Sequence, residues 1–349
     1  MNSQPTSYNV TVLPSSRSFQ TQPDEFILAA AIRQGIGLPY GCKDGACGSC
    51  KCRMERGEVQ MLPYAAKALS EQERQQGYIL TCRAKPFTDV VIESRQVTDE
   101  RAFPIRKMPV RVRQLVPLGP DVMQVLLQLP ATETFRYHAG QYVEFLLKDG
   151  SRRAYSMAVA PHVQAESPGL ELHIRHHPGG QFTEHVFTNM KEKEILRIEG
   201  PFGSFYLRED SGKPIILLAS GTGFAPIKAM LEHVRHKRIM RPIAFYWGGR
   251  RPADLYMNDW VLEQVRSLPN LHYVPVVSNA LPEDDWQGRT GFVHQAVLDD
   301  FDDLSGHEVY ACGAPIVVDS ARTAYTESRS LPEDAFYADA FTTAADVAA

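Results

Sequence analysis

The chain has 349 residues, more than one ordinary domain requires, so two or three domains are expected. Hydrophobic residues make up 44% of the sequence and charged residues 22%, a globular composition that excludes collagen-like, coiled-coil and wholly disordered chains. The 37 basic and 41 acidic residues give a net charge of −4, which argues against a nucleic-acid partner, and no apolar run is long enough to indicate a membrane partner.

Residues 1–98 are predicted to form a small α+β domain. Residues 8–12 alternate apolar and polar side chains, which is typical of a half-buried strand, and the stretch that begins at Ser70 is a capping box that predicts a helix start. The other elements expected here are a helix over 27–34 and strands over 78–83 and 89–93. The polar, charged stretch over 99–108 is interpreted as a linker.

Strand patterns dominate residues 109–210, which favours an antiparallel β-barrel. Residues 149–150 read Asp-Gly, a strong signal for a hairpin turn. The expected strands lie at 110–116, 122–129, 142–148, 153–158, 170–175 and 195–199.

The pattern changes in residues 211–349, where apolar strands alternate with helices. Such alternation predicts a parallel α/β domain. The strands are expected to start near 215, 243, 272 and 308, and the helices to cover 225–236, 253–267 and 290–298. The whole chain is therefore predicted to be a multidomain α+β and α/β protein.

Five of the six cysteines lie in the first quarter of the chain. The N-terminus lacks the pattern of a signal peptide, so we expect a cytoplasmic protein whose cysteines serve metal or redox chemistry rather than disulfides. Cys42, Cys47 and Cys50 are separated by four and two residues, and Cys82 follows after 31 more, which is the plant-type [2Fe–2S] spacing. These four are the predicted metal ligands. A zinc site is the alternative, and Cys52 has no assigned role.

Residues 41–50 resemble the cluster loop of plant-type ferredoxin domains, and residues 80–84 resemble the strand that carries their fourth ligand. This resemblance implies a β-grasp ferredoxin-like domain over 1–98. Glycines at 41, 45 and 48 would allow the backbone to wrap a cluster and direct N–H groups at its sulfurs.

Residues 153–156 read Arg-Ala-Tyr-Ser and resemble the Arg-x-Tyr-Ser motif of the ferredoxin-NADP reductase superfamily. Arg153 and Tyr155 are two positions apart on a predicted strand and share one face. A guanidinium suits a pyrophosphate, and an aromatic ring suits an isoalloxazine. The resemblance implies that Arg153 holds the FAD pyrophosphate, Tyr155 stacks on the flavin and Ser156, as a catalytic residue, hydrogen-bonds near flavin N5.

Gly180 and Thr183 belong to a segment that resembles the Gly-Gly-x-x-Ser/Thr motif of the same superfamily. Backbone N–H groups at the start of the helix that follows can bind the same pyrophosphate. Residues 200–203 resemble the motif that closes the barrel. The resemblance therefore implies an FAD-binding β-barrel over 109–210.

Gly221, Thr222 and Gly223 stand between a predicted strand and a predicted helix, where a Gly-x-Gly turn binds a dinucleotide pyrophosphate. Residues 217–226 resemble the nicotinamide-dinucleotide loop of the superfamily, which implies an NAD(P)-binding domain over 211–349. Residues 312–315 resemble its Cys-Gly-x-Pro motif. The resemblance implies that Cys312 is a catalytic residue beside the nicotinamide, with Gly313 in the cofactor site. Phe341 is a candidate for the C-terminal aromatic residue that covers the flavin, with simple packing as the alternative.

The identity of the dinucleotide is left open by the residues. Residues 246–251 end in two arginines, with no Asp or Glu placed for a ribose 2′-hydroxyl. Arg250 is a candidate ligand for a 2′-phosphate, or is simply solvated. The relatives that look most similar mostly use NADH, so NADH is expected and NADPH is the alternative.

In the order ferredoxin-like domain, flavin barrel and nicotinamide domain, the chain resembles NAD(P)H-dependent flavin and iron–sulfur reductases of the ferredoxin-NADP reductase superfamily. The CDP-6-deoxy-Δ3,4-glucoseen reductase group looks closest, and reductase components of ring-hydroxylating dioxygenases or soluble monooxygenases are the alternative. The resemblance implies an oxidoreductase that passes electrons from NAD(P)H through FAD and a [2Fe–2S] cluster to a separate protein, a dehydrase or an oxygenase. A redox-sensing electron-transfer module is the alternative of another class.

Overall fold

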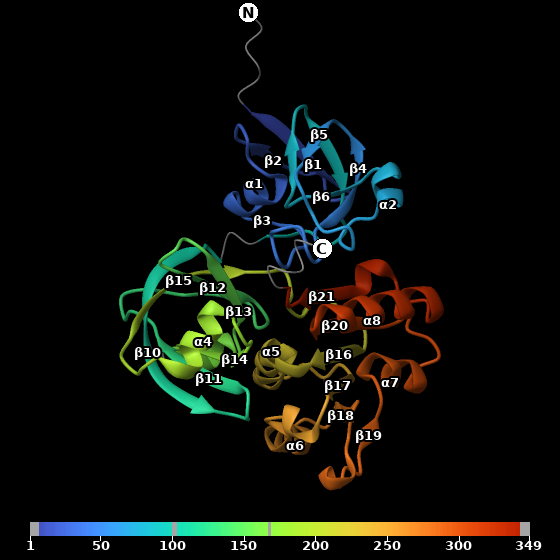
Figure 1. Ribbon diagram of the computed structural model, residues 1–349. Coiled ribbons are helices and arrows are strands. Elements are labelled where there is room, and N and C mark those ends of the chain that lie inside the picture. The colour runs from blue at the N-terminus through green and yellow to red at the C-terminus, as the bar shows by residue number, and fades with distance from the viewer. Residues whose placement is uncertain (1–6, 100–102, 167–168, 343–349) are drawn as a thin grey trace, which may run out of the picture. The chain divides into compact units, whose positions relative to one another are not determined.

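The computed structural model describes residues 7–99, 103–166 and 169–342. The chain separates into two compact units (Figure 1). The first unit comprises residues 1–104 and 339–349, and the second comprises residues 105–338. Within the described ranges, no helix is long and apolar enough to cross a membrane.

The first unit is built on a five-stranded mixed sheet in the order β2-β1-β8-β4-β6, the arrangement expected for a β-grasp domain. The pairing of β1 with β8 is parallel, and the other pairings in this sheet are antiparallel. Val10 and Val12 are buried while Thr11 between them is half-buried, as the alternating pattern predicts. The strands are β1 (Tyr8–Leu13), β2 (Arg17–Thr21), β4 (Lys51–Arg56), β6 (Tyr78–Leu80) and β8 (Val90–Glu93).

Two short helices and two small strand pairs complete this unit. Helix α1 (Ile27–Arg33) buries four of its apolar residues, and helix α2 (Glu71–Gln75) begins at the predicted capping box. The Ser70 hydroxyl accepts the Glu73 N–H at 3.2 Å, and the Glu73 carboxylate accepts the Ser70 N–H at 2.8 Å. The strand pairs are β3 (Ile36–Gly37) with β9 (Thr98–Asp99), and β5 (Val59–Met61) with β7 (Ala84–Pro86).

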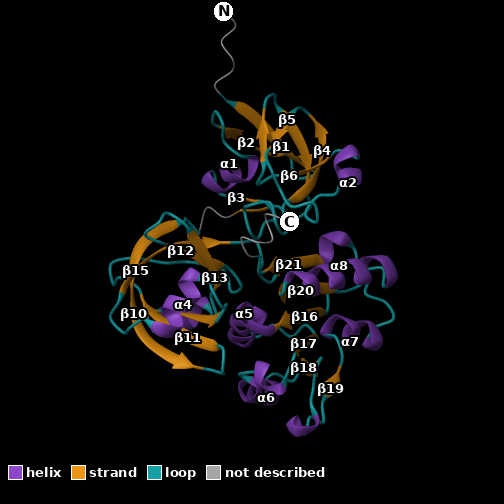
Figure 2. Ribbon diagram, viewed as in Figure 1, coloured by secondary structure: helices purple, strands orange, loops and turns teal. Residues whose placement is uncertain are grey.

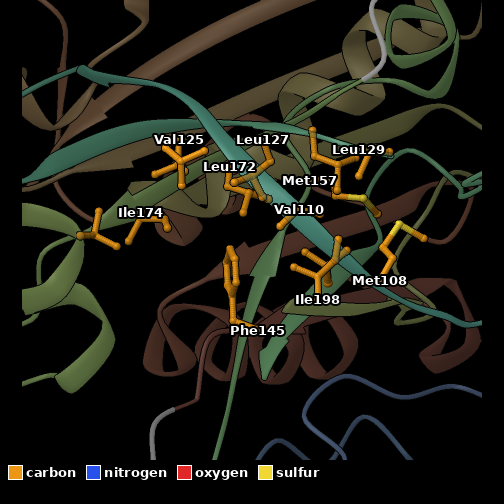
Figure 3. Packing of buried hydrophobic residues seen from close by; sticks show 14 of the residues in the cluster. Met108, Val110, Val125, Leu127, Leu129, Phe145, Met157, Leu172, Ile174 and Ile198 are labelled. Carbon is orange, nitrogen blue, oxygen red and sulfur yellow. The ribbon is translucent and has the colours of Figure 1, made fainter. Parts of the chain in front are cut away.

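The second unit begins with a six-stranded antiparallel sheet in the order β13-β12-β15-β10-β11-β14. An antiparallel bridge between Met157 and Leu172 joins its two outer strands, so the sheet closes into the expected barrel. Figure 3 shows the packed interior, where Phe145, Val110 and Ile198 are buried. The strands are β10 (Arg106–Pro117), β11 (Val122–Gln128), β12 (Tyr142–Leu146), β13 (Arg152–Ser156), β14 (Leu170–Arg175) and β15 (Ile195–Phe202), and the helices are α3 (Pro161–Glu166) and α4 (Gln181–Thr188).

The rest of the second unit is an α/β domain whose sheet has the order β19-β18-β17-β16-β20-β21. The pairings of β16 with β17 and β20, and of β18 with β17 and β19, are parallel. Figure 2 shows α5 and α6 on one face of the sheet and α7 and α8 on the other. The strands are β16 (Ile215–Ser220), β17 (Ile243–Gly249), β18 (Leu271–Val277), β19 (Arg289–Thr290), β20 (Glu308–Gly313) and β21 (Phe336–Ala340), and the helices are α5 (Phe224–Lys237), α6 (Asn258–Ser267), α7 (Val293–Asp300) and α8 (Pro315–Ser328).

Several elements differ from the sequence-based expectation at their ends. Strand β10 begins at Arg106, inside the expected linker over 99–108, because buried Met108 extends the alternating pattern backwards past Pro109. Residues 100–102 of that linker lie outside the described residues. The helix expected over 253–267 is divided, since a turn of 3₁₀-helix over Pro252–Asp254 precedes α6. The helix expected from residue 290 starts only at Val293, because β19 pairs with β18.

Candidate cofactor sites

The four predicted cluster ligands form two thiol pairs. The backbone N–H of Cys42 points at the Sγ of Cys47 and that of Cys47 at the Sγ of Cys42, both at 3.4 Å, and the Sγ atoms of Cys50 and Cys82 lie 3.2 Å apart. Hydrogen bonding from Cys42 lowers the pKa of Cys47 to about 6, although burial opposes this shift. Two pairs of thiols, with one sulfur already favouring the thiolate, suit the two irons of a [2Fe–2S] cluster.

The backbone of the cysteine loop repeatedly adopts left-handed conformations. The φ angles of Lys43, Gly45 and Gly48 are 65°, 87° and 73°. Left-handed residues spaced along a loop in this way turn nearby backbone N–H groups toward a common centre. Such a centre suits an anionic group such as an iron–sulfur cluster. A Cβ atom at Gly48 would lie 3.0 Å from the Ala68 carbonyl oxygen, so the tight course of the loop there depends on glycine.

Cys82 lies in a turn and not in a strand as expected. Strand β6 ends at Leu80, and the Arg83 N–H donates to the Leu80 carbonyl at 2.9 Å to form the turn. The Thr81 N–H donates to the Cys50 carbonyl at 3.2 Å, which holds this turn against the cysteine loop and brings the Sγ atoms of Cys50 and Cys82 together.

Within the described ranges, no group of three or more His, Cys, Asp or Glu residues could hold a single metal ion.

Cys52 belongs to β4 and takes no part in either thiol pair. It is buried, and its strand pairs it with Ile79 of β6. Burial raises the pKa of the Cys52 thiol, so this residue stays protonated and behaves as a small apolar side chain.

Strand β13 presents Arg153 and Tyr155 on one face, as the sequence predicts, and both side chains are half-buried. The Tyr155 ring lies 5.5 Å from that of Phe182 in α4, and burial raises the pKa of the Tyr155 hydroxyl. The Arg153 guanidinium donates one hydrogen bond, to the Arg152 carbonyl at 2.8 Å. Its other N–H groups form no hydrogen bond with a described residue, which suits a side chain that binds a phosphate.

The start of α4 lies beside this strand. Gly180 is the N-cap, and no side chain caps the helix, so N–H groups of the first turn are available to an anion. A Cβ atom at Gly180 would lie 2.7 Å from the Thr183 hydroxyl oxygen. That hydroxyl donates to the His177 carbonyl at 2.9 Å and accepts the His177 N–H at 3.2 Å. Thr183 therefore shapes the turn that exposes the helix N-terminus.

The Gly-x-Gly turn lies where the order of strands in the α/β sheet reverses. It forms a 3₁₀ turn, Gly221–Gly223, between β16 and α5, and no side chain caps either helix start. A Cβ atom at Gly223 would lie 2.2 Å from the Cys312 carbonyl oxygen, and one at Gly313 would lie 2.3 Å from the Ser220 carbonyl oxygen. Glycine at these positions lets the ends of β16 and β20 approach closely. Ligands of open α/β sheets bind at such a reversal point.

Four other predicted site residues lie in a turn or at strand ends. Thr222 is half-buried within the Gly-x-Gly turn. Cys312 is fully buried at the end of β20, and Ser156 is buried at the end of β13. Phe341 is half-buried and belongs to the first unit. Contacts of these four residues with a cofactor stay predictions.

The two arginines after β17 differ in their surroundings. The Arg251 guanidinium binds the Asp284 carboxylate through two hydrogen bonds of 2.8 and 2.6 Å. The Arg250 side chain is exposed and forms no ion pair with a described residue, while its backbone N–H donates to Asp254 at 2.8 Å. Of the two, Arg250 is therefore the one that can bind a phosphate.

Arg175 is a candidate that the sequence analysis did not identify. It ends β14 of the barrel, yet its Nη1 lies 2.8 Å from the position of a Cβ atom on Gly221 of the dinucleotide turn. Its guanidinium contacts Asp121 at 3.2 Å and Asp254 at 3.1 Å. The sequence placed Arg175 correctly on a strand, but no local pattern shows that this strand end meets a turn 46 positions later.

Three family models match consecutive parts of the chain. A 2Fe-2S iron-sulfur cluster binding domain matches residues 10–87, an oxidoreductase FAD-binding domain matches residues 109–206, and an oxidoreductase NAD-binding domain matches residues 217–323. Each match contains the corresponding motifs, and together they establish the [2Fe–2S], FAD and NAD cofactors predicted from the sequence.

Curated relatives match over almost their full length. A CDP-6-deoxy-L-threo-D-glycero-4-hexulose-3-dehydrase reductase from Yersinia pestis is 38% identical over 338 residues, which cover 96% of this chain and 98% of the relative. The phenol hydroxylase P5 protein of Acinetobacter pittii is 35% identical, with 98% and 97% covered. Terephthalate 1,2-dioxygenase reductase component 2 of a Comamonas species is 33% identical, with 96% and 98% covered.

The solved structure of the Amycolatopsis cytochrome P450 reductase GcoB is similar to this chain, with a TM-score of 0.78 and 31% identity. The match covers 96% of this chain and 99% of that one. The predicted fold class, with its ferredoxin-like, barrel and α/β parts, is thereby confirmed, and so is the oxidoreductase assignment. The chain belongs to the family of NAD(P)H-dependent flavin and iron–sulfur reductases, which combine a 2Fe-2S domain, an FAD-binding domain and an NAD-binding domain in one polypeptide.

Proposed function

We propose that this reductase passes its electrons to a hexulose dehydrase. The observation that carries the proposal is the 38% identity with the Yersinia dehydrase reductase over 96% of the chain. An oxygenase component is the second candidate acceptor, because the phenol hydroxylase and terephthalate dioxygenase relatives match at 35% and 33% over similar lengths. In both cases the acceptor is a separate protein.

The residues of each site have distinct tasks in this proposal. Gly221, Thr222, Gly223 and Gly313 bind the dinucleotide, with Cys312 beside the nicotinamide. Arg153 and the start of α4 hold the FAD pyrophosphate, Tyr155 packs against the flavin, and Ser156 donates a hydrogen bond near its reactive nitrogen. When bound, FAD accepts two electrons as a hydride from NAD(P)H and releases them singly to the cluster. Cys42, Cys47, Cys50 and Cys82 hold that cluster.

The proposed division into domains is 1–98, 109–210 and 211–349, with 99–108 as the connection. The three family matches fall within these ranges. We also propose a cytoplasmic location, supported by the four cysteines that form the thiol pairs suited to an iron–sulfur cluster. For the dinucleotide we propose NADH, with NADPH as the alternative that Arg250 would serve.

A reconstitution assay tests the acceptor. The purified holoprotein is mixed with NADH and either a purified hexulose dehydrase with its substrate or a purified phenol hydroxylase oxygenase with phenol. NADH oxidation that requires both the dehydrase and its substrate is expected. Oxidation that responds only to the oxygenase would replace the first candidate by the second. Conversion of either substrate by the reductase alone would overturn the separate acceptor.

An anaerobic titration separates turnover from redox sensing. NADH is expected to bleach the flavin and iron–sulfur absorbance within the time of a single catalytic turnover. Ferricyanide is expected to restore the absorbance, and this cycle should be repeatable. A Cys82→Ser variant serves as the matched control, because it should still show flavin bleaching without the cluster component. Slow, single reduction without repeated turnover would favour a sensing module.

A further inference from the structure

A chain of buried and half-buried polar side chains crosses from the flavin barrel to the dinucleotide-binding domain within the second unit. Its barrel members lie on β14, and its partners lie on α5 and in the segment before α6. We call this chain the interdomain clamp. It consists of Glu171, His173, Lys228, Glu232 and Tyr256.

The protonation of the clamp follows from its geometry. The pKa of Glu171 is lowered to about 2, against the effect of burial, chiefly by its hydrogen bond with His173 and by Lys228, so Glu171 is ionised. The His173 side chain is fully buried, and burial lowers its pKa, so the ring is neutral. Its Nε2 lies 2.8 Å from Glu171 Oε1 and must carry the proton. Its Nδ1 then accepts the hydrogen bond of the Tyr256 hydroxyl at 3.0 Å.

The α5 residues of the clamp form hydrogen bonds with the backbone that follows β13. The Lys228 ammonium donates to the Ala158 carbonyl at 3.0 Å, besides its contacts with Glu171 at 3.2 Å and Glu232 at 2.7 Å. The Glu232 carboxylate accepts the Ala160 N–H at 2.8 Å. Each hydrogen bond fixes the position of one helix turn against one peptide group.

The two ends of the clamp are the two cofactor motifs. Ala158 follows Ser156, the last residue of the Arg-x-Tyr-Ser strand, by two positions. Helix α5 starts directly after the Gly221–Gly223 turn, and Lys228 lies in its second turn. The clamp therefore ties the dinucleotide turn to the flavin motif through short, rigid elements.

Burial of its charged groups makes the clamp a poor source of stability, because removing these charges from water costs free energy. Lys228 and Glu232 are only 5% and 7% exposed, and charges so placed often stabilise a fold less than apolar residues of similar size would. What such a network does provide is a defined geometry, because a displaced ion pair or hydrogen bond leaves a buried group unpaired. A defined geometry matters most where two reacting rings must meet, since a displacement of about 1 Å can cost 10²-fold in rate.

We propose that the interdomain clamp positions the nicotinamide against the flavin for hydride transfer. The inference rests on the proposed function of the two motifs. The hydride leaves C4 of the nicotinamide with both electrons and binds at N5 of the flavin, which is reduced as NADH becomes NAD⁺. His173, Lys228 and Tyr256 are positioning residues in this step, because they set the distance between the motifs that hold the two rings.

Tyr256→Phe and Lys228→Met test the proposal, with Tyr246→Phe as the matched control. Tyr256→Phe removes only the hydroxyl that reaches His173, and the control removes a buried tyrosine hydroxyl that binds Asp300 at 2.7 Å without contacting the barrel. Stopped-flow reduction by NADH under anaerobic conditions gives the rate at saturation and the Kd separately. The deuterium isotope effect with 4-deuterated NADH shows whether hydride transfer limits the rate.

The expected result is a loss in the saturating rate of roughly threefold or more for Tyr256→Phe and tenfold or more for Lys228→Met, with a larger isotope effect and Kd changed less than twofold. Tyr246→Phe should match the wild type, and dithionite should reduce all three proteins equally. An unchanged saturating rate, or an increase in Kd without a change in the saturating rate, would overturn the proposal. If Lys228→Met does not fold, Tyr256→Phe decides alone. Failure of the wild-type protein to be reduced by NADH would instead overturn the proposed function.

Discussion

At the scale of single residues, the cysteines of the first unit divide into the four that form thiol pairs, which are the proposed cluster ligands, and Cys52. Cys82 pairs with Cys50 at 3.2 Å, whereas Cys52, two positions from Cys50, is a buried thiol of β4. Chain proximity alone would have made Cys52 the better neighbour of Cys50. The turn after β6 selects Cys82 instead, because it brings that Sγ to the cysteine loop.

Cys82→Ser is expected to abolish the iron–sulfur absorbance and its electron paramagnetic resonance signal after reduction, with the flavin retained. A hydroxyl is a poor ligand for iron where the pattern requires a thiolate. Cys52→Ser is the control and should keep the full signal. A normal cluster in Cys82→Ser, or loss of the cluster in a folded Cys52→Ser protein, would contradict the assignment.

The second prediction at this scale concerns the choice of dinucleotide. Arg250→Ala should lower the catalytic efficiency with NADPH by about tenfold or more, since a charge-assisted hydrogen bond contributes about 1.5–3 kcal/mol. The efficiency with NADH should change less than twofold, because Arg250 would contact only the 2′-phosphate. Steady-state kinetics with both cofactors checks this. Equal losses with both would assign Arg250 to the common part of the dinucleotide.

How far single residues can be predicted depends on whether their partners are local. The spacing of the cysteines and the two-residue separation of Arg153 and Tyr155 are local features, so the four paired cysteines and the face shared by Arg153 and Tyr155 could be predicted from the sequence. The roles of these cysteines as cluster ligands stay predictions. Arg175 and His173 could not, because their partners Gly221 and Tyr256 lie far along the chain and only the packed barrel brings them together.

At the scale of elements, periodicity predicted existence and type better than boundaries. Strand β14 has the predicted bounds of Leu170–Arg175, because apolar and polar residues alternate throughout its sequence, Leu-Glu-Leu-His-Ile-Arg. Strand β6 ends at Leu80, three residues before the expected end. Its continuation, Thr81-Cys82-Arg83, contains no Gly or Pro that would end the strand, but hydrogen bonds to the cysteine loop and within the turn redirect the backbone there. Tertiary contacts of this kind leave no periodic trace.

The close contact between the ends of β16 and β20 gives a prediction for Gly313→Ala. Its φ angle is 123°, and the added Cβ atom would lie 2.3 Å from the Ser220 carbonyl oxygen. The two strand ends must separate, so reduction by NADH should slow at least tenfold while dithionite still reduces the flavin. Gly306→Ala is the control, since nothing lies within 4 Å of the Cβ position there. Wild-type reduction rates in Gly313→Ala would show that the contact is dispensable.

At the scale of the whole molecule, the alternation of strands and helices predicted the parallel sheet, and the dense run of short strands predicted the barrel. The grouping of residues 105–338 into one unit was beyond the sequence. This grouping depends on contacts such as those of Lys228 with Glu171 and with Ala158, which lie 57 and 70 positions before it in the chain. The change in strand and helix pattern separates the barrel from the α/β domain, but nothing in the composition shows that the two domains share a polar interface.

The stability of the molecule is expected to fall as the pH drops below about 6.5. Burial lowers the pKa of four histidines below the ordinary value of about 6.5, namely His162, His173, His294 and His307. Below that pH the unfolded chain binds protons that the folded chain refuses, so the free energy of unfolding decreases. Melting temperatures between pH 8 and pH 5.5 measure this. His307→Gln should flatten the decline in part, and a melting temperature that rises as the pH falls would contradict the assignment.

The two thiol pairs also differ in what they do for the chain as a polymer. Cys42 and Cys47 are five positions apart, so a link between them through the iron of the proposed cluster restrains less of the chain, whereas Cys50 and Cys82 are 32 positions apart and enclose β4, β5, α2 and β6. Cross-linking a loop of that length removes conformational freedom from the unfolded chain worth about 3–4 kcal/mol. Insertion of the proposed cluster would therefore also stabilise the fold of the first unit. The second pair would then act as a cross-link, and a cell that runs short of iron would have a less stable first unit as well as an interrupted electron path.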